Sequence, residues 1–382
     1  MRTKRKRAKR IRQKESLIWQ ARRLGYAAGY GGGFDAGYHA GRCTMVHERL
    51  TAAGVQTVPF DKSVMYVSQG TPGFRTIDRG IMNALGRLAR EAIQVTSGDP
   101  VALLAELHRP DLVLVLNGIF SVGTDQIDRI RAMGIPTAVW VADDPYFSDQ
   151  TRQIATHYDV VFTHEISCVT MYREAGCRAV HYLPFAADPD LFRPSHPPAM
   201  RTDVLFIGMA FPNRLAFFNR LMPMLTRRNV LIAGGGWQHL AGYDRLKDRI
   251  WLSGIDPEVT PLFYSGAKIV INLHRSDQEA GNTLRFPGLS VNPRTFEIGA
   301  CGALQLVDER AELYRHYTPG QDLVTFSSPE DLMEKVDYFL RREDVRRNVA
   351  ISGMKRTLRH HTYVHRLQHM FHLLSQPGGV WG

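Results

Sequence analysis

The sequence predicts an α/β protein built from two consecutive doubly wound domains. Short runs rich in valine and isoleucine alternate with segments of helical period, first between residues 64 and 183 and again between residues 204 and 358. Such runs are typical of parallel strands buried on both faces, and their alternation with helices favours sheets that helices cover. A proline-dense segment at 183–198 separates the two series and indicates an interdomain connection.

The first series supplies six strands and five helices. Each apolar run is too short for a helix, so we expect strands at Val64–Val67, Ala92–Val95, Leu112–Leu116, Thr137–Val141, Val160–Phe162 and Val180–Leu183. We expect helices between them, near 76–90, 100–108, 124–133, 149–156 and 165–175.

The second series repeats the alternation. We expect strands at Val204–Ile207, Val230–Ile232, Ile269–Ile271, Leu304–Val307 and Val324–Phe326. We expect helices near 213–226, 257–265, 293–301, 330–341 and 343–358. Two such domains that face each other present strand ends on both walls of a cleft, which is where a ligand is expected to bind.

The positive charge of the chain is concentrated in its first residues. The formal net charge is +11, and residues 1–23 hold eleven basic side chains and one acid, a net of +10, so the remainder carries only +1. The body is therefore nearly neutral, and the cationic arm is a candidate contact for nucleic acid or another polyanion.

A repeat of period four follows the arm, with glycine at 25, 29, 33, 37 and 41 and an aromatic residue after each of the first four. On a helix this spacing aligns a glycine groove beside an aromatic ridge. Interior glycines cost about 1 kcal/mol each relative to alanine, so such a helix needs a partner. Two interpretations remain open: a helix for oligomerisation or docking, and a flexible lead-in of low complexity.

The composition excludes several classes of protein. With 44% hydrophobic and 22% charged residues the chain is expected to fold as a globular protein. The most apolar stretch, Leu112–Phe120, is far shorter than a membrane span, and no apolar core of a secretory signal follows the basic start. The four cysteines stand far apart, so we expect reduced thiols and a cytoplasmic location.

The strand at 204–207 introduces the first candidate binding residues. It is followed by Gly208, which could let the backbone amides after it approach a phosphate, and by Arg214 at the start of the next helix, where a guanidinium could add a charge-assisted contact. A glycine after a strand is equally typical of a simple turn.

The stretch 292–308 is the most informative. Asn292 is suited to cap a helix that Gly302 ends before a buried strand. In that helix Glu297 could accept two hydroxyl hydrogen bonds from a ribose, while Arg294 and the helix start favour a diphosphate. The alternative is a helix on which Arg294 and Glu297 are solvated or paired.

These residues carry a resemblance. The run Asn-x-Arg-x-Phe-Glu-x-x-x-x-Gly-Ala-x-Gln-Leu-x-Asp at 292–308 resembles the C-terminal domain of the CgeB-type spore-maturation proteins, which are glycosyltransferases of the GT-B type. Further similarities cover most of residues 60–372: Trp-x-x-Asp-Asp-Pro at 140–145, the linker at 183–194, Phe-Ile-Gly at 206–208 with Arg214, and the ending at 361–366.

The resemblance implies a GT-B fold, a nucleotide-sugar donor held mainly by the C-terminal domain and an acceptor recognised mainly by the N-terminal domain. Related retaining transferases carry two glutamates separated by seven residues. If Glu297 is the second, Leu289 stands in place of the first, and Glu279 could substitute for it from a longer loop. The sugar and the stereochemical outcome stay open.

Asp143 and Asp144 are the candidate catalytic residues. Either carboxylate could orient or deprotonate an acceptor hydroxyl, and the pair could bind a metal, but adjacent carboxylates before proline are also typical of a turn or helix cap. The histidines at 361, 365 and 369 share a helix face without a further ligand, and fit an amphipathic terminal helix better than a metal site. Because a helix dipole and cationic side chains can stabilise the leaving diphosphate, we expect no metal and no cofactor.

These observations lead to one organisation and one leading function. We expect a basic and Gly-Tyr helical arm at 1–44, an acceptor domain at 45–190, a nucleotide-sugar domain at 191–358 and a terminal helix at 359–382 that packs toward the acceptor domain. The leading function is transfer of a sugar from a nucleoside diphosphate to a hydroxyl of a glycan, protein or other surface component. The alternatives are sugar transfer to modified nucleic-acid bases and a non-catalytic nucleotide-binding scaffold.

Overall fold

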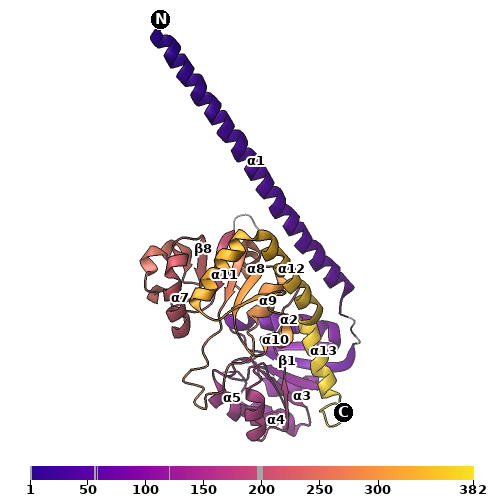
Figure 1. Cartoon of the computed structure of the whole chain (residues 1–382). Helices are drawn as coiled ribbons and strands as arrows, with labels where there is room; N and C mark the ends of the chain where they lie inside the picture. The colour runs from indigo at the N-terminus through magenta and orange to yellow at the C-terminus, as the bar shows by residue number, and fades with distance from the viewer. Residues whose placement is uncertain (1, 56, 58, 120, 196–200) are drawn as a thin grey trace.

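The computed structural model contains two α/β halves from which one long helix projects (Figure 1). It describes the chain except for residues 1, 56, 58, 120 and 196–200; within the first helix it describes the side chains at 19, 20, 23, 30 and 31 and from 33 onward.

The first half is built on a six-stranded sheet of order β2-β1-β3-β4-β5-β6, in which all paired strands are parallel. Its strands are β1 (Phe60–Ser68), β2 (Ala89–Thr96), β3 (Leu112–Leu116), β4 (Thr137–Val141), β5 (Val160–Thr163) and β6 (Ala179–Tyr182). Its helices are η1 (Pro72–Phe74), α2 (Arg75–Leu88), α3 (Val101–His108), α4 (Thr124–Ala132), α5 (Ser148–Ile154), η2 (Ala155–His157) and α6 (Cys168–Glu174).

The second half repeats this plan with a parallel sheet of order β12-β11-β10-β7-β8-β9. Its strands are β7 (Thr202–Ile207), β8 (Val230–Ala233), β9 (Ile250–Trp251), β10 (Ala267–Asn272), β11 (Leu304–Asp308) and β12 (Val324–Phe326). Its helices are α7 (Pro212–Leu225), η4 (Trp237–His239), η5 (Tyr243–Arg245), η6 (Lys247–Arg249), α8 (Thr260–Gly266), α9 (Arg294–Ala300), α10 (Leu313–His316), α11 (Pro329–Arg341) and α12 (Glu343–His360).

The predicted fold class is confirmed. Every strand that the sequence predicts is present, and consecutive crossovers fold both halves into doubly wound sheets. The sequence analysis missed β9, because a strand of two residues offers no pattern from which to predict it.

The last helix, α13 (Tyr363–Leu374), returns to the first half and packs on α2. Its buried Leu367, Met370 and Phe371 belong to the same core cluster as the strand residues Tyr66 and Trp140. The polypeptide therefore crosses between the halves twice, once near residues 183–201 and once between α12 and α13.

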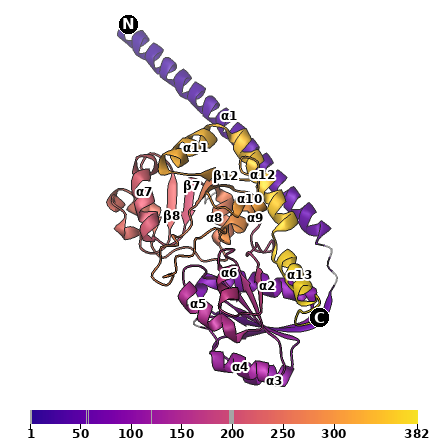
Figure 2. The same cartoon turned by 60° about the horizontal axis from the view of Figure 1, so that its bottom comes forward.

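Helix α1 (Arg2–Ala53) is continuous through the Gly-Tyr repeat, so the structure has a helix there and not an irregular lead-in. Only its last part packs on the body, where Cys43, Val46 and Leu50 meet Ile351 and Met354 of α12. The rest of α1 projects away from both sheets (Figure 2). The basic side chains before residue 19 lie outside the described side chains. Among the helices that the structure describes, none combines the length and apolarity needed to cross a bilayer.

Candidate active site

A cavity of about 210 Å³ lies between the two halves, at the carboxyl end of β7. Its lining comes from both sides of the cleft: Gly73, Thr76 and Ile77 from the first half, and Phe192, Ile207, Ile255, Pro257, Thr260, Tyr264, Pro293, Arg294 and Glu297 from the linker and the second half. Pockets for whole small ligands are usually about 300–1,000 Å³. This cavity therefore fits part of a nucleotide sugar, not the entire donor.

The start of α9 is fixed by Asn292, as the sequence predicts. The Asn292 Oδ1 accepts the amide of Thr295 at 3.1 Å, which satisfies one of the free N–H groups of the first turn. The Asn292 amide donates to His274 Nε2 at 3.0 Å, and His274 Nδ1 lies 2.6 Å from Asp308. The imidazole is therefore neutral, consistent with the lowering of its pKa by burial.

Glu297 lies on α9 and faces the first half across the cavity. Its side chain is buried, with 8% exposed, and its Oε1 accepts a hydrogen bond from Thr76 Oγ1 at 3.4 Å. Burial raises its pKa to about 7, although Arg294 one turn earlier opposes the shift. One weak hydrogen bond leaves most of the acceptor capacity of this carboxylate unused, so it is suited to accept hydroxyl groups from a ligand.

The two predicted arginines, Arg214 of α7 and Arg294 of α9, lie near each other. Arg214 is 2% exposed, stacks on Phe206 and Phe211, and donates to the carbonyls of Met209 and Leu273 at 3.0 Å. Desolvation, reinforced by Arg294, lowers its pKa to about 9.

Arg294 forms no ion pair within the part of the chain that the structure describes, and it lines the cavity. It is therefore the better placed of the two predicted arginines to meet an anion directly. The buried Arg214 adds its charge to the positive electrostatic potential at the site.

Two backbone amides at and after Gly208 are already hydrogen-bonded within the protein. The Gly208 amide donates to Ala233 at 2.8 Å and the Ala210 amide to Gly235 at 2.9 Å, so neither is free for a phosphate. A side chain at Gly234 would place its Cβ 2.1 Å from the Gly208 carbonyl oxygen, which shows how closely the loops after β7 and β8 approach. The glycine at 208 serves backbone packing.

Asp143 and Asp144 occupy different environments. Asp143 is half-buried after β4, and Asn117 at the end of β3 donates to it at 2.7 Å. Asp144 is fully buried and accepts hydrogen bonds from the hydroxyls of Thr151, Thr163 and Tyr172 at 2.6–3.0 Å. Burial raises the pKa of both, that of Asp144 to about 6. Only Asp143 retains exposed surface, so Asp144 is placed to hold α5 and α6 on the sheet.

The loop between β10 and α9, residues 273–293 and here named the bridging loop, is anchored to the first half. Thr283 donates its hydroxyl to Asp149 at 2.8 Å, and the Asp149 amide donates to Gly281 at 3.0 Å. The buried carboxylate of Glu165 accepts the amides of Leu289 and Ser290, both at 3.1 Å. The loop therefore ties the two halves together directly before α9.

Glu279 lies on this loop but does not line the cavity around Glu297. Its carboxylate pairs with Arg275 at 2.7 Å, and Arg275 in turn stacks on Tyr146 and Phe211. The position of the absent first glutamate is held by Leu289, whose amide is bound by Glu165.

The sequence analysis missed two polar residues at strand ends. Asn117 is fully buried and fixes Asp143 through its side-chain amide and carbonyl. His164, directly after β5, is 7% exposed, and its ring lies within hydrogen-bonding reach of the backbone of Ala142 and Asp144 and tilted against Phe185. Burial lowers its pKa to about 4, so it is neutral. Both residues follow a predicted strand immediately, which is the signal that could have identified them.

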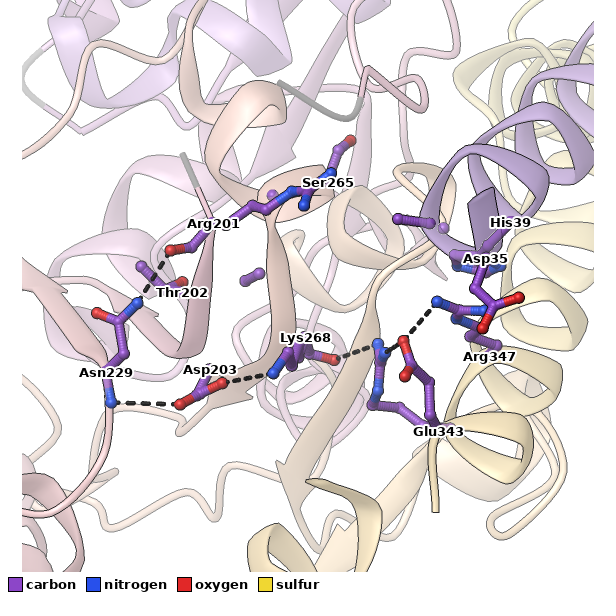
Figure 3. A pocket seen from close by; sticks show the side chains of 15 residues that line it. Asp35, His39, Arg201, Thr202, Asp203, Asn229, Ser265, Lys268, Glu343 and Arg347 are labelled. Atoms are coloured by element: carbon purple, nitrogen blue, oxygen red, sulfur yellow. Dashed lines mark hydrogen bonds and ion pairs between the residues drawn. The ribbon is translucent and has the colours of Figure 1, made fainter. Parts of the chain in front are cut away.

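A second cavity, of about 400 Å³, lies at the opposite edge of the second sheet, where β7 and β10 begin (Figure 3). Its cations are largely neutralised: Lys268 pairs with Asp203 at 2.8 Å, and Arg346 and Arg347 both bind Glu343. The carboxyl ends of parallel strands, not their starts, carry ligand sites in such sheets, so the smaller cavity is the candidate site.

Metal binding finds no obvious ligand set. Within the residues that the structure describes, no three histidine, cysteine, aspartate or glutamate side chains are grouped so that they could hold an ion. The His361 ring contacts Arg366 at 3.0 Å, and His365 caps α13 through Thr362 at 2.7 Å.

Comparison with known proteins agrees with the fold and the sequence motifs. A family described as "Glycosyl transferase-like" matches residues 214–372. The chain is 27% identical over 307 residues to spore protein CgeB of Bacillus subtilis (strain 168), covering 77% of this chain and 93% of that protein.

Solved structures share the two-domain architecture. The Anabaena Alr3699/HepE protein, solved in complex with UDP-glucose, superposes with a TM-score of 0.58 at 13% identity over 82% of this chain and 99% of that one. Sucrose-phosphate synthase (tll1590) from Thermosynechococcus elongatus has a TM-score of 0.56 at 13% identity, over 82% and 98%. At such low identity these similarities establish the GT-B fold alone. The chain is therefore similar in sequence to spore protein CgeB and, over residues 214–372, to the glycosyl transferase-like family, and it shares its fold with GT-B proteins.

Proposed function

We propose that this glycosyltransferase moves a sugar from a nucleoside-diphosphate sugar to a hydroxyl acceptor without a metal ion. The observation that carries the proposal is the placement of Glu297 and Arg294 on one helix, facing a cavity that both halves line. A carboxylate that accepts ribose hydroxyls beside a cation that meets a diphosphate is the combination a donor of this class requires. The HepE structure with bound UDP-glucose supports the choice of donor class.

The reaction places negative charge on the leaving group. The acceptor hydroxyl forms a bond to the anomeric carbon while the bond from that carbon to the diphosphate oxygen breaks, and the hydroxyl proton is released. Arg294, with Arg214 behind it, stabilises the diphosphate as its charge grows, which is where catalysis gains most. In this assignment the cationic side chains of the protein stabilise the diphosphate, so the proposed mechanism needs no metal.

Asp143 is the proposed acceptor-side residue. It lies at the carboxyl end of β4, Asn117 fixes its orientation, and burial raises its pKa toward the range of a useful proton acceptor. We assign it to orient or deprotonate the acceptor hydroxyl. Asp144 supports it by fixing the adjacent backbone.

The test is donor hydrolysis and nucleotide binding by purified protein. A panel of nucleoside diphosphates and their sugars, screened by thermal shift, should include at least one that raises the melting temperature. Glu297→Ala and Arg294→Ala should each abolish that rise. Retention of both nucleotide binding and turnover by the two variants would contradict the assignment.

A nucleic-acid acceptor is the second candidate, and the observation that favours it is the +10 charge of residues 1–23. Phosphate contacts from such a segment would give sequence-independent, salt-sensitive affinity. Replacing its lysines and arginines with glutamine should then abolish salt-sensitive binding to DNA and RNA. Unchanged affinity would eliminate this acceptor class.

A further inference from the structure

The projecting part of α1 carries an apolar face that nothing in the body covers. Phe34 and Tyr38 are each 63% exposed and Tyr30 is 69% exposed, although large aromatic side chains in a monomer are normally buried. We name Tyr30, Phe34 and Tyr38 the aromatic ridge. Met45, 49% exposed, continues the same face toward the body.

The ridge lies opposite the surface by which α1 packs on the body. Phe34 precedes the buried Cys43 by nine residues, about two and a half turns, which places the two on opposite sides of the helix. Docking of α1 on α12 therefore leaves the ridge facing outward, on the helix that projects from the body in Figures 1 and 2.

A groove of glycines runs beside the ridge. A Cβ added at Gly33, Gly37 or Gly41 would have no atom of the described chain within 4 Å, apart from the nearby backbone of α1 itself. Each of these glycines costs the helix about 1 kcal/mol relative to alanine, and no contact within the chain recovers that cost. Close approach of another helix backbone would recover it.

We propose that this face binds the same face of a second copy of the chain. Ridge and groove both repeat every four residues, about 6 Å along the axis. Rows of side chains four apart interdigitate when two helices cross at about −50°. A partner must present a ridge and a groove of this same spacing. Helix α1 of another copy does so by symmetry. Pairing of the same surface on both copies is an isologous interface.

The distribution of charge along α1 indicates which kind of partner binds this face and in which direction the two helices run. Between residues 24 and 41 the only charged side chain is Asp35, so a polyanion finds no cations on this face. A parallel pair would bring two segments of +10 side by side. The helices therefore cross antiparallel near Gly37, which sends the basic segments to opposite ends.

The size of the contact predicts its strength. Aromatic side chains bury about 150–250 Å² each, so four rings from Phe34 and Tyr38 of two copies give an interface of roughly 600–1,000 Å². This is below the usual range for stable complexes. The dimer should therefore form reversibly.

Sedimentation equilibrium of the full chain tests the proposal. The protein should self-associate reversibly, and Phe34→Glu should weaken dimerisation by at least about tenfold, equivalent to 1.4 kcal/mol. The matched control is Leu107→Glu on α3, since Leu107 is an equally exposed apolar residue on another surface, at 73%. This control should leave the dimer intact.

The groove is tested by Gly37→Leu. Space around Gly37 is open in the single chain, so the variant should keep or raise helicity in circular dichroism while it loses the dimer. Gly86→Leu on α2, also in open space, is the control. A wild-type chain that stays monomeric, including one that binds lipid vesicles instead, or a dimer that Phe34→Glu and Gly37→Leu leave unchanged, would overturn the proposal.

Cross-linking reports the direction of crossing. All four native cysteines are buried, so introduced cysteines can be targeted selectively. A mixture of Gly33→Cys and Gly41→Cys chains should cross-link far more than either variant alone. Cross-linking of each variant with itself would show a parallel pair and refute the antiparallel arrangement.

Discussion

Thr76 of the first half and Glu297 of the second lie 3.4 Å apart, hydroxyl to carboxylate, across the floor of the interdomain cavity. Thr76 is the second residue of α2, which follows the short η1 turn, and Glu297 lies in the first turn of α9. This hydrogen bond links the Glu297 carboxylate, which belongs to the second half, to the first half. Its ionisation is therefore sensitive to cleft occupancy as well as to pH.

Donor affinity should rise with pH through the pKa of Glu297. Hydroxyl groups bind a carboxylate better than a carboxylic acid, and burial raises this pKa to about 7. Isothermal titration with a nucleoside diphosphate should therefore show affinity that increases from pH 6 to pH 8. In Glu297→Gln the profile should be flat over this range; a slope that survives in the variant would assign the titration to another group.

Stability should respond to Glu297 in the opposite sense. The folded pKa of about 7 exceeds the ordinary value of 4.5, so between these values the native state holds a proton that the unfolded state has released. Stability attributable to this group therefore falls as pH rises from about 4.5 to 7. Glu297→Gln should be more stable than wild type at pH 8 by about 3 kcal/mol, at 1.36 kcal/mol per pKa unit. Equal unfolding midpoints in urea would argue for a solvated carboxylate.

Arg294 should discriminate the diphosphate from the nucleoside. A charge-assisted hydrogen bond contributes about 1.5–3 kcal/mol, so Arg294→Ala should weaken nucleoside-diphosphate binding about tenfold to a hundredfold. Affinity for the free nucleoside should not change. Arg294→Lys, which keeps the charge without the planar fork, should lie between the two. Equal losses for nucleoside and diphosphate would place Arg294 outside the phosphate site.

Substitution of Asp143 should impair catalysis, whereas substitution of Asp144 should impair stability. Asp143→Asn should lower kcat by about 10²–10⁴, as expected for loss of general base or acceptor positioning, and leave the melting temperature and nucleotide affinity unchanged. Asp144→Asn should lower the melting temperature, because three buried hydroxyls lose a charged acceptor. The reverse pattern would exchange the two roles.

The anchor of the bridging loop should hold the cleft together. Glu165→Ala removes the acceptor for the amides of Leu289 and Ser290 and should destabilise the protein by about 2–4 kcal/mol. Hydrogen exchange should accelerate across residues 281–291, and KM for the donor should rise more than kcat falls. Glu174→Ala, at the exposed end of α6, is the control and should change none of these. Unchanged exchange in Glu165→Ala would show that the loop is held by other contacts.

The sheets and α9 could be predicted because their signals are local. Buried parallel strands such as Leu112–Leu116 are short unbroken apolar runs, and their order follows from the doubly wound pattern. The capping of α9 by Asn292 is set by residues three apart in sequence. Local patterns of this kind can be recognised in the sequence without knowledge of the fold.

The remainder of the site depends on contacts between distant residues. Asp143 and Asp144 are adjacent and identical, and only the positions of Thr163 and Tyr172 decide that Asp144 is enclosed. The bridging loop has no period, so nothing in it indicates that its amides meet Glu165 from the other half. The Gly208 amide donates to the Ala233 carbonyl of β8, a contact between separate strands that the local sequence does not indicate.

Helix α1 also keeps the basic stretch at the start of the chain far from the nearly neutral body. With a rise of about 1.5 Å per residue, the basic stretch that ends at Arg23 lies some 30 Å along the axis from Cys43, where the helix meets the body. This is about four Debye lengths at physiological ionic strength. Within a single chain, a polyanion bound to the basic stretch therefore leaves the electrostatic potential around Glu297 and Arg294 as the body sets it.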